Sequence, residues 1–284
     1  AGVLEPGQVC TILQMSGGER EELMAFKETC SACRGLVDKV QAEKLYVFGG
    51  VDAWYHRPGN PLRAAEKFSP QTGQWEALPR TSVPRVGSVA GILSGRVYLL
   101  GGLGELDQTI EWFSPRLQRW ETTRPAPKLS TARAFAAAVA VHGRLYICGG
   151  HDPKEGMVHR SLEVFDPSLA RFELLPVTML VPRADLAAAR VPGQEARLFV
   201  CGGHDTSYVS HACDTAEALR LSGSGAAWQR LPSMTTPRHA HSAVTLEGSI
   251  VVCGGSNGVD RNHSSVEHFD WASRSWSPLP SMSV

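Results

Sequence analysis

The chain has 284 residues, 43% of them hydrophobic, and its 28 basic and 28 acidic side chains give a formal net charge of zero. The balanced charge and the lack of a basic run argue against nucleic acid or an anionic membrane surface as the main partner. No apolar run reaches the length of a membrane span and no signal-peptide pattern opens the chain, so we expect a folded, cytoplasmic domain.

The dipeptide Gly-Gly recurs at nearly even spacing and divides the chain into repeats. Successive pairs are 52, 48, 53 and 52 residues apart, and each closes a short apolar run: Gly49-Gly50, Gly101-Gly102, Gly149-Gly150, Gly202-Gly203 and Gly254-Gly255. Self-similarity at a fixed period of about fifty residues is typical of an array of similar structural units.

Other residues keep phase with the glycine pairs. An arginine precedes each pair by 15 to 19 residues, and a glutamate follows each pair: Glu66, Glu111, Glu163, Glu217 and Glu267. An aromatic residue follows the glutamate after nine residues in four repeats and after eleven in the fourth: Trp75, Trp120, Phe172, Trp228 and Trp276. The repeat therefore has a constant frame, with one variable stretch between the glycine pair and the glutamate.

Residues 1–33 are predicted to belong to the array, although residues 19–27 are charged and helix-prone. Residues 13–18 resemble residues 219–224 of the fourth repeat, and an arginine follows at a similar distance in both. We therefore expect residues 9–26 to form the outer two strands of a sixth unit. Its inner strands are missing from both ends of the chain, so either the chain is a segment of a longer protein or the array closes in an unusual way.

Each repeat is predicted to contain four short β-strands. The first is small and apolar, as at 88–93, 135–141 and 242–246, which is typical of a strand buried on both faces. A glycine turn leads into a β-branched and aromatic second strand that ends at the glycine pair, as expected for a hairpin. The third strand holds the glutamate and the fourth holds the aromatic residue.

Four antiparallel strands per repeat predict an all-β fold, a β-propeller of four-stranded antiparallel blades. We expect six blades, with the sixth incomplete in this chain. The single propeller domain, 1–284, is predicted to divide into a partial blade and five full blades, with bounds 1–33, 34–82, 83–130, 131–180, 181–235 and 236–284.

The arginine, the glycine pair, the glutamate and the tryptophan at these offsets resemble the Kelch repeat, with five copies between residues 34 and 284. The resemblance implies that the repeated residues mainly pack the blades. Glycine permits positive φ and close backbone approach where the second strand ends, and the aromatic residue is expected to lie between adjacent blades. Six-bladed Kelch rings commonly complete one blade with strands from both termini.

The seven cysteines are expected to be reduced. Cys148, Cys201 and Cys253 occupy the last position of the second strand in three different blades, which predicts buried thiols. Cys30 and Cys33 form a lone Cys-x-x-Cys, without two further ligands at the spacing that a zinc site requires. No metal and no cofactor are therefore expected.

The loop between the glycine pair and the glutamate varies from 8 to 15 residues and differs most between repeats. Loops gather at the ends of a propeller and together form a composite surface. The first loop carries an aromatic and cationic cluster of the kind enriched in interface hot spots. The candidate binding residues in the loops are Trp54, Tyr55, His56, Arg57, His151, Asp152, His204, Asp205, Tyr208, His211, Asn257, Arg261 and His263.

Two interpretations exist for the loop histidines. A metal-dependent enzyme would build a site from the His-Asp loops, whereas polar loops of a binding surface also contain these residues. Nucleophile motifs and phosphate-binding loops are absent from the sequence, so we favour the binding surface and expect no enzyme.

Kelch domains that recruit substrates to cullin-based ubiquitin ligases use loop residues and the arginine that opens each blade. The resemblance adds five candidates, for which bonding to nearby backbone carbonyls is an equally weighted alternative: Arg34, Arg85, Arg133, Arg183 and Arg238. We predict a non-enzymatic module that binds a protein or peptide. The resemblance implies that this module is the substrate-recognition part of a ligase adaptor, whose flanking domains contact the cullin. An actin-binding or scaffolding Kelch protein is the alternative.

Overall fold

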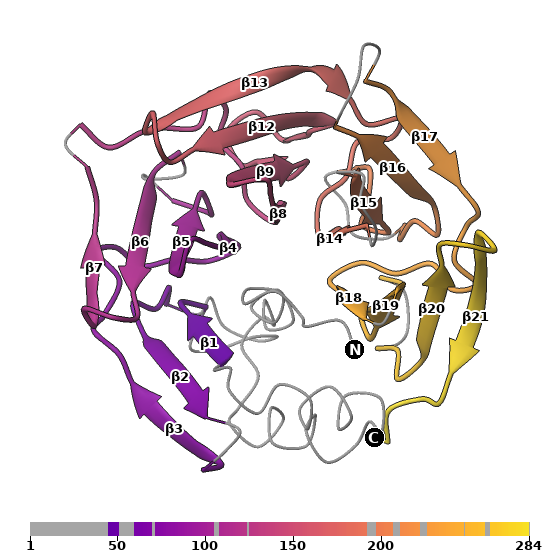
Figure 1. Cartoon of the computed structure of the whole chain (residues 1–284), viewed down its shortest axis with the longest axis horizontal. Helices are drawn as coiled ribbons and strands as arrows, with labels where there is room; N and C mark the ends of the chain where they lie inside the picture. Colours follow the sequence, from indigo (N-terminus) through magenta and orange to yellow (C-terminus); the bar gives the residue numbers. More distant parts are fainter. Residues whose placement is uncertain are drawn as a thin grey trace.

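The computed structural model is a ring of small antiparallel β-sheets arranged as the blades of a propeller (Figure 1). The regular elements that it describes are β-strands, and no helix within the described residues is long and apolar enough to cross a membrane. The described residues are 45–50, 60–69, 72–104, 108–123, 125–191, 197–206, 211–221, 226–246, 248–258 and 262–283.

Five sheets form the described ring, and we name them blades I to V in chain order. Blade I contains β1 (Leu45–Phe48), β2 (Ala65–Ser69) and β3 (Gln74–Ala77). Blade II contains β4 (Val89–Leu93), β5 (Arg96–Leu100), β6 (Ile110–Ser114) and β7 (Arg119–Glu121). Blade III contains β8 (Ala137–Val141), β9 (Arg144–Cys148), β12 (Ser161–Asp166) and β13 (Arg171–Thr178). Blade IV contains β14 (Ala187–Arg190), β15 (Arg197–Cys201), β16 (Ala216–Arg220) and β17 (Trp228–Leu231). Blade V contains β18 (Ser242–Leu246), β19 (Ser249–Cys253), β20 (Val266–Asp270) and β21 (Ser275–Leu279).

The predicted propeller of four-stranded antiparallel blades is confirmed. In blades II to V each strand pairs with its neighbour in chain order, so β4, β8, β14 and β18 lie around the centre and the fourth strands lie on the circumference (Figure 1). Blade I has three described strands; its predicted inner strand and the predicted partial blade at 1–33 lie outside the described residues. The blade boundaries proposed from the sequence stay a prediction.

The inner hairpins turn on residues with positive φ. Ser94 (51°) and Gly95 (71°) join β4 to β5, and His142 (48°) and Gly143 (73°) join β8 to β9. Two consecutive positive φ values define the type I′ turn, whose twist matches that of the paired strands. The predicted glycine turns are confirmed at both positions.

The aromatic residue of the fourth strand lies between blades, as predicted. Trp120 of blade II packs edge-on against Phe48 of blade I, with 5.3 Å between ring centroids. Its indole N–H donates to the carbonyl of Pro79, which follows blade I, at 2.7 Å. Trp276 makes the same bond to Pro232, at 2.8 Å. Each indole thus joins its blade to the preceding one through an apolar face and a polar edge.

Blade III carries an additional hairpin that the sequence did not predict. β10 (His151–Asp152) and β11 (Met157–Val158) pair within the loop after Gly149-Gly150. The carboxylate of Asp152 accepts from the backbone N–H groups of Lys154 at 2.8 Å and Glu155 at 3.1 Å. This turn is built by a side chain, so hydrophobic periodicity gives no sign of it.

Candidate functional site

A buried arginine–glutamate pair holds blade III together. The guanidinium of Arg133 donates from Nε to Glu163 at 2.9 Å and from Nη1 to the carbonyl of Gly149 at 2.7 Å. Its Nη2 donates to the hydroxyl of Ser161 at 2.6 Å. Both side chains of the pair are 0% exposed. Arg133 therefore joins the segment before the inner strand to the end of the second strand and the start of the third.

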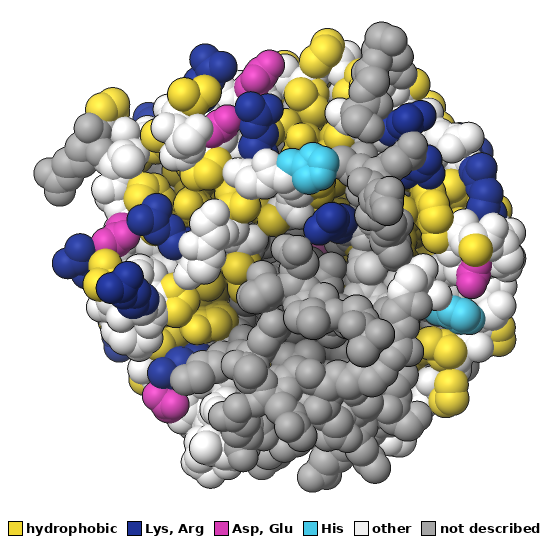
Figure 2. Space-filling model, viewed as in Figure 1, with side chains coloured by type: hydrophobic (Ala, Val, Ile, Leu, Met, Phe, Trp, Pro, Cys, Tyr) yellow, Lys and Arg dark blue, Asp and Glu magenta, His cyan; other side chains and the backbone are white. Residues whose placement is uncertain are grey.

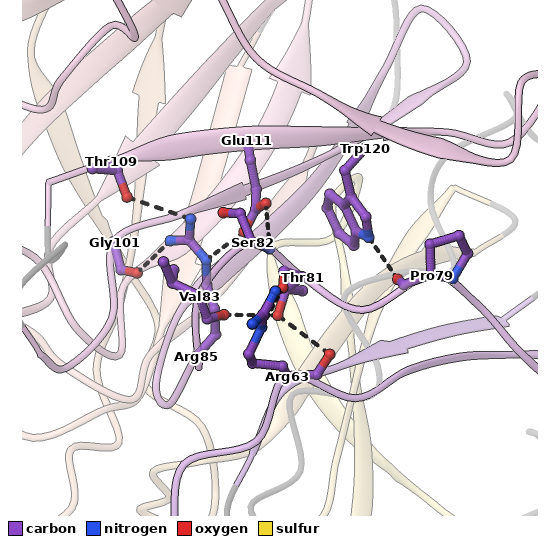
Figure 3. Close-up of polar contacts among 10 residues, drawn as sticks. All are labelled: Arg63, Pro79, Thr81, Ser82, Val83, Arg85, Gly101, Thr109, Glu111 and Trp120. Atoms are coloured by element: carbon purple, nitrogen blue, oxygen red, sulfur yellow. Dashed lines mark hydrogen bonds and ion pairs between the residues drawn. The ribbon is translucent and has the colours of Figure 1, made fainter.

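The same network recurs in blades II, IV and V. Figure 3 shows it in blade II, where Arg85 binds Glu111, the Gly101 carbonyl and the Thr109 hydroxyl. Arg183 pairs with Glu217 and Arg238 pairs with Glu267 in blades IV and V, at 2.8 and 2.9 Å. A Ser or Thr two residues before the glutamate contributes a hydroxyl in all four blades: Thr109, Ser161, Thr215 and Ser265.

The glutamates of blades II to V also anchor the chain that arrives from the preceding blade. Glu111 accepts from the backbone N–H of Ser82 at 3.0 Å (Figure 3), and Glu163 accepts from that of Ser130 at 2.7 Å. A buried carboxylate needs several donors in addition to its cation, and these backbone groups provide them.

The described arginines therefore make hydrogen bonds and ion pairs inside the blades. Their side chains are no more than 2% exposed: Arg85, Arg133, Arg183 and Arg238. A guanidinium with this burial and these partners does not reach a peptide on the surface, so the geometry supports the alternative of carbonyl bonding. Arg34 lies outside the described residues.

The glycine pairs connect neighbouring blades. The N–H of Gly150 donates to the carbonyl of Arg183 in the next blade at 2.7 Å. A Cβ atom on Gly149 would lie 2.3 Å from that same carbonyl oxygen, and its φ is +63°. Glycine is thus required both for the conformation and for the approach of the two backbones, as predicted.

A chain of backbone hydrogen bonds runs from blade to blade beside the inner strands. Phe135 donates to Gly87, Asp185 donates to Phe135, and Ala240 donates to Asp185, at 2.7 to 2.8 Å. Each of these residues lies two positions after its blade's arginine and has φ between 51° and 62°. Because β4, β8, β14 and β18 surround the centre (Figure 1), we call these four residues the central backbone chain.

The second strands end on the same side of the ring where the inner strands begin, because the two are antiparallel. We call this side the loop face. In blades II to V the first residue after the glycine pair lies on this face: Leu103 in blade II, His151 in blade III, His204 in blade IV and Ser256 in blade V. Recognition by a propeller requires variable residues of this kind on a constant frame.

The predicted loop residues have different environments. Asp205 and His211 are exposed, and His151, Asn257 and His263 are partly buried. Asp152 and His204 are buried. Burial is also the main cause that lowers the pKa of His263. The remaining candidates, which are Trp54, Tyr55, His56, Arg57, Tyr208 and Arg261, lie outside the described residues.

Several residues that sequence reasoning missed lie on the loop face. Leu103 is 40% exposed, and its N–H donates to the carbonyl of Val86 beside Gly87. Asp185 and His239 lie next to His204. A signal was present in the sequence, because Phe135 and Asp185 share a position two residues after an arginine. The direction of these two side chains nevertheless depends on a positive φ, which the sequence did not reveal.

The cysteine predictions hold in part. Cys148, Cys201, Cys213 and Cys253 are free thiols, and the first two are buried. Cys253 is only partly buried, contrary to prediction, and packs against the small core of blade V that includes Val251 and Val266. Cys10, Cys30 and Cys33 lie outside the described residues.

Among the residues that the structure describes, no group of three His, Cys, Asp or Glu side chains is arranged to hold a metal ion. Sγ of Cys201 does lie 3.3 Å from Nε2 of His241. Burial raises the pKa of the Cys201 thiol to about 12 and lowers the pKa of His241 to about 3. Both groups are neutral near pH 7, so this pair packs blades IV and V and lacks the thiolate that a nucleophile needs.

The buried imidazole of His241 makes the propeller sensitive to acid. Its pKa is about 3 in the folded protein against an ordinary value of 6.5, so the unfolded chain binds the extra proton. The contribution of neutral His241 to the free energy of unfolding is fully present above pH 6.5. Below pH 6.5 it falls by roughly 1.4 kcal/mol per pH unit until the folded pKa is reached. We expect His241→Gln to flatten this dependence in urea unfolding between pH 6.5 and 4.

Exposed His142 provides the control for that measurement. His142→Asn keeps a residue that tolerates the positive φ of 48° at this turn and should retain the wild-type slope. Equal slopes in wild type and His241→Gln would refute the assignment.

Figure 2 shows one side of the ring, where cationic and anionic side chains of the described residues lie around the rim with hydrophobic side chains between them. The large hydrophobic side chains that are most exposed are Leu103, Leu117, Met157, Leu169, Leu174 and Leu180. Leu103 and Leu117 belong to blade II, Met157, Leu169 and Leu174 belong to blade III, and Leu180 follows β13.

Sheets of four antiparallel strands around a centre, each tied by an arginine–glutamate pair and a glycine pair, define a repeat-built β-propeller. The KLHDC2/KLHL20/DRC7 Kelch-repeats domain matches residues 37–255 and the Kelch motif matches residues 237–283. The chain therefore belongs to the Kelch-repeat family.

Relatives share this repeat at moderate identity. The chain is 34% identical over 144 residues to human Kelch-like protein 33, and 31% identical over 146 residues to beta-scruin of Limulus polyphemus. These matches cover 50% and 47% of the chain but only 26% and 15% of the relatives, so the chain spans a small part of their length. Kelch domain-containing protein 10 of Xenopus laevis is 24% identical over 257 residues, covering 80% of the chain and 61% of that protein.

The fold also resembles a solved structure. The structure of YjhT superposes with a TM-score of 0.66 at 15% identity and covers 78% of each chain. At this identity the likeness concerns the propeller fold alone.

Proposed function

We propose that the chain is a non-enzymatic protein-interaction module that binds a protein or peptide partner through its loop face. The observation that carries the proposal is the contrast between frame and loop face. The arginine–glutamate contacts repeat from blade to blade, while the loop between the glycine pair and the glutamate varies from 8 to 15 residues. Loops on a rigid scaffold can alter specificity without altering the core.

The described part of this surface offers Leu103, Asp205 and His211 as exposed side chains. Trp54, Tyr55, His56, Arg57, Tyr208 and Arg261 are proposed as further binding residues on the sequence pattern alone. Aromatic and arginine side chains are the types that most often carry binding energy in interfaces.

Partner binding by purified components tests the proposal. A partner is first captured with the chain from cells, then purified and titrated against a triple variant, Leu103→Ala with Asp205→Ala and His211→Ala. We expect at least about tenfold weaker binding, equivalent to roughly 1.4 kcal/mol.

The control is Leu117→Ala with Leu169→Ala, which removes two exposed side chains from turns between third and fourth strands on the opposite side of the ring. This double variant should bind as wild type does. Loss of binding in the control with full binding by the triple variant would place the interface on the other side and refute the proposal.

The finer role that we propose is substrate recognition for a cullin-based ubiquitin ligase, through domains outside this chain. It is supported by the Kelch resemblance and by the small share of Kelch-like protein 33 that the chain covers. Cullin recovered with the full-length protein, together with ubiquitination of the captured partner, is the expected result. Co-sedimentation with actin filaments and no cullin would instead favour the scaffolding alternative.

A further inference from the structure

His204 is held between two hydrogen-bond acceptors. Its Nδ1 lies 2.6 Å from the carbonyl oxygen of Thr206, and its Nε2 lies 3.2 Å from Oδ2 of Asp185. The imidazole is 5% exposed. A neutral imidazole carries a single N–H, whereas a carbonyl and a carboxylate only accept. Both bonds therefore form together only when His204 carries a proton on each nitrogen.

The neighbouring charges favour that state. Burial lowers the pKa of His204, but the hydrogen bonds to Asp185 and Thr206 and the charges of Asp185 and Asp205 together outweigh it, so the pKa is raised above 6.5. The ring of His239 approaches edge-on, with 5.9 Å between centroids. Burial, His204 and His263 lower the pKa of His239 although Asp185 raises it. His204 thus takes the proton while His239 stays neutral.

The two partners of His204 belong to different parts of the molecule. Asp185 is fixed in the central backbone chain, where its N–H donates to Phe135 and its carbonyl accepts from Ala240. Thr206 belongs to the loop that follows Gly202-Gly203. A doubly protonated His204 consequently ties this loop to the centre of the ring, and loss of one proton removes a donor from one of the two bonds.

We propose that His204 is a proton-operated latch that fixes the blade IV loop to the central backbone chain and so regulates the loop face. The regulatory part rests on the proposed binding function, whereas the latch itself does not. The latch is closed at pH values below the raised pKa of His204, where the ring carries a proton on each nitrogen. It opens as the pH rises through the raised pKa of His204, because the folded state then loses its extra proton.

Blade III provides a matched comparison. His151 occupies the same position after Gly149-Gly150, and its backbone bridges to Ala134 as that of His204 bridges to Ala184. The position of Asp185 is taken in blade III by Phe135, which has no carboxylate. His151→Gln therefore changes a loop-face histidine without changing the latch.

Histidine imidazole NMR from pH 5.5 to 8.5 tests the latch directly. We expect one imidazole, identified by its loss in His204→Gln, to be protonated on both nitrogens at pH 6.5 and to titrate above it. Asp185→Asn should lower that pKa by about one unit, a tenfold change in proton affinity. A pKa of His204 at or below 6.5, or one that Asp185→Asn leaves unchanged, would overturn the proposal.

Amide hydrogen exchange reports the loop. After correction for intrinsic rates, the amide of His204, which donates to the carbonyl of Ala184 at 2.9 Å, should be more protected at pH 6 than at pH 8.5. His204→Gln should abolish this difference and His151→Gln should keep it. Protection that does not change with pH would overturn the latch.

Regulation is tested last, with the captured partner. Its affinity should change between pH 6 and pH 8.5 in wild type and stay constant in His204→Gln. Constant affinity in both would overturn the regulatory part. The NMR and exchange measurements contain no partner, so a failure of the proposed binding function leaves their result unchanged.

Discussion

Arg133→Ala is expected to lower the free energy of unfolding by about 3–5 kcal/mol, because removing one partner of a buried ion pair leaves the other charge buried without compensation. Glu163 retains the Ser130 N–H as a donor but loses its cation. The Gly149 carbonyl and the Ser161 hydroxyl lose their donor in the same step. Thermal unfolding followed by circular dichroism should show a midpoint lowered by roughly 10 °C.

A surface pair in the same blade is the control. Arg144 pairs with Asp166 at 3.1 Å, and its side chain is 51% exposed. Arg144→Ala should cost less than about 1 kcal/mol, as exposed ion pairs do. Combining Arg133→Met with Glu163→Leu should recover part of the loss, because two apolar side chains leave no unpaired charge. Equal effects of Arg133→Ala and Arg144→Ala would contradict a structural role for the buried pair.

The propeller could be predicted from the sequence because the repeated residues are the ones that build the blades. In each glycine pair, a Cβ added to at least one of the glycines would lie under 3 Å from a backbone carbonyl oxygen, and the arginines and glutamates of blades II to V are constrained by burial. Such residues recur at fixed spacing, which is what periodicity detects. The arginines remained ambiguous because spacing does not say whether a guanidinium faces inward. The Ser or Thr two residues before the glutamate in blades II to V was the missed indication of an inward network.

The loop face could not be predicted to the same depth. Hydrophobic periodicity does not reveal the turn at Asp152 that orders the additional hairpin of blade III. Asp185 meets His204 across 19 residues of chain, through a positive φ of 51° that an aspartate adopts only in a particular backbone context. Contacts made by single loop side chains have no period, so only coordinates bring them together.

Gly149→Ala is expected to destabilise the propeller by about 2–5 kcal/mol, from the left-handed conformation and from overpacking against backbone. Its φ is +63°, and the added Cβ would lie 2.3 Å from the Arg183 carbonyl oxygen of blade IV. A backbone carbonyl cannot swing aside as a side chain end does, so blades III and IV must separate. Urea unfolding should show a lowered midpoint.

Gly143→Ala separates the two causes. Gly143 has a similar φ of +73°, but an added Cβ meets nothing within 4 Å, so only the conformational cost of roughly 1–2 kcal/mol applies. The difference in lost stability between Gly149→Ala and Gly143→Ala then measures the cost of overpacking where the backbones of blades III and IV approach each other. It should appear locally as faster exchange of the Gly150 amide, which donates to Arg183 at 2.7 Å. If both variants lose the same stability, the glycine pair is needed for its conformation alone and the inter-blade contact contributes nothing.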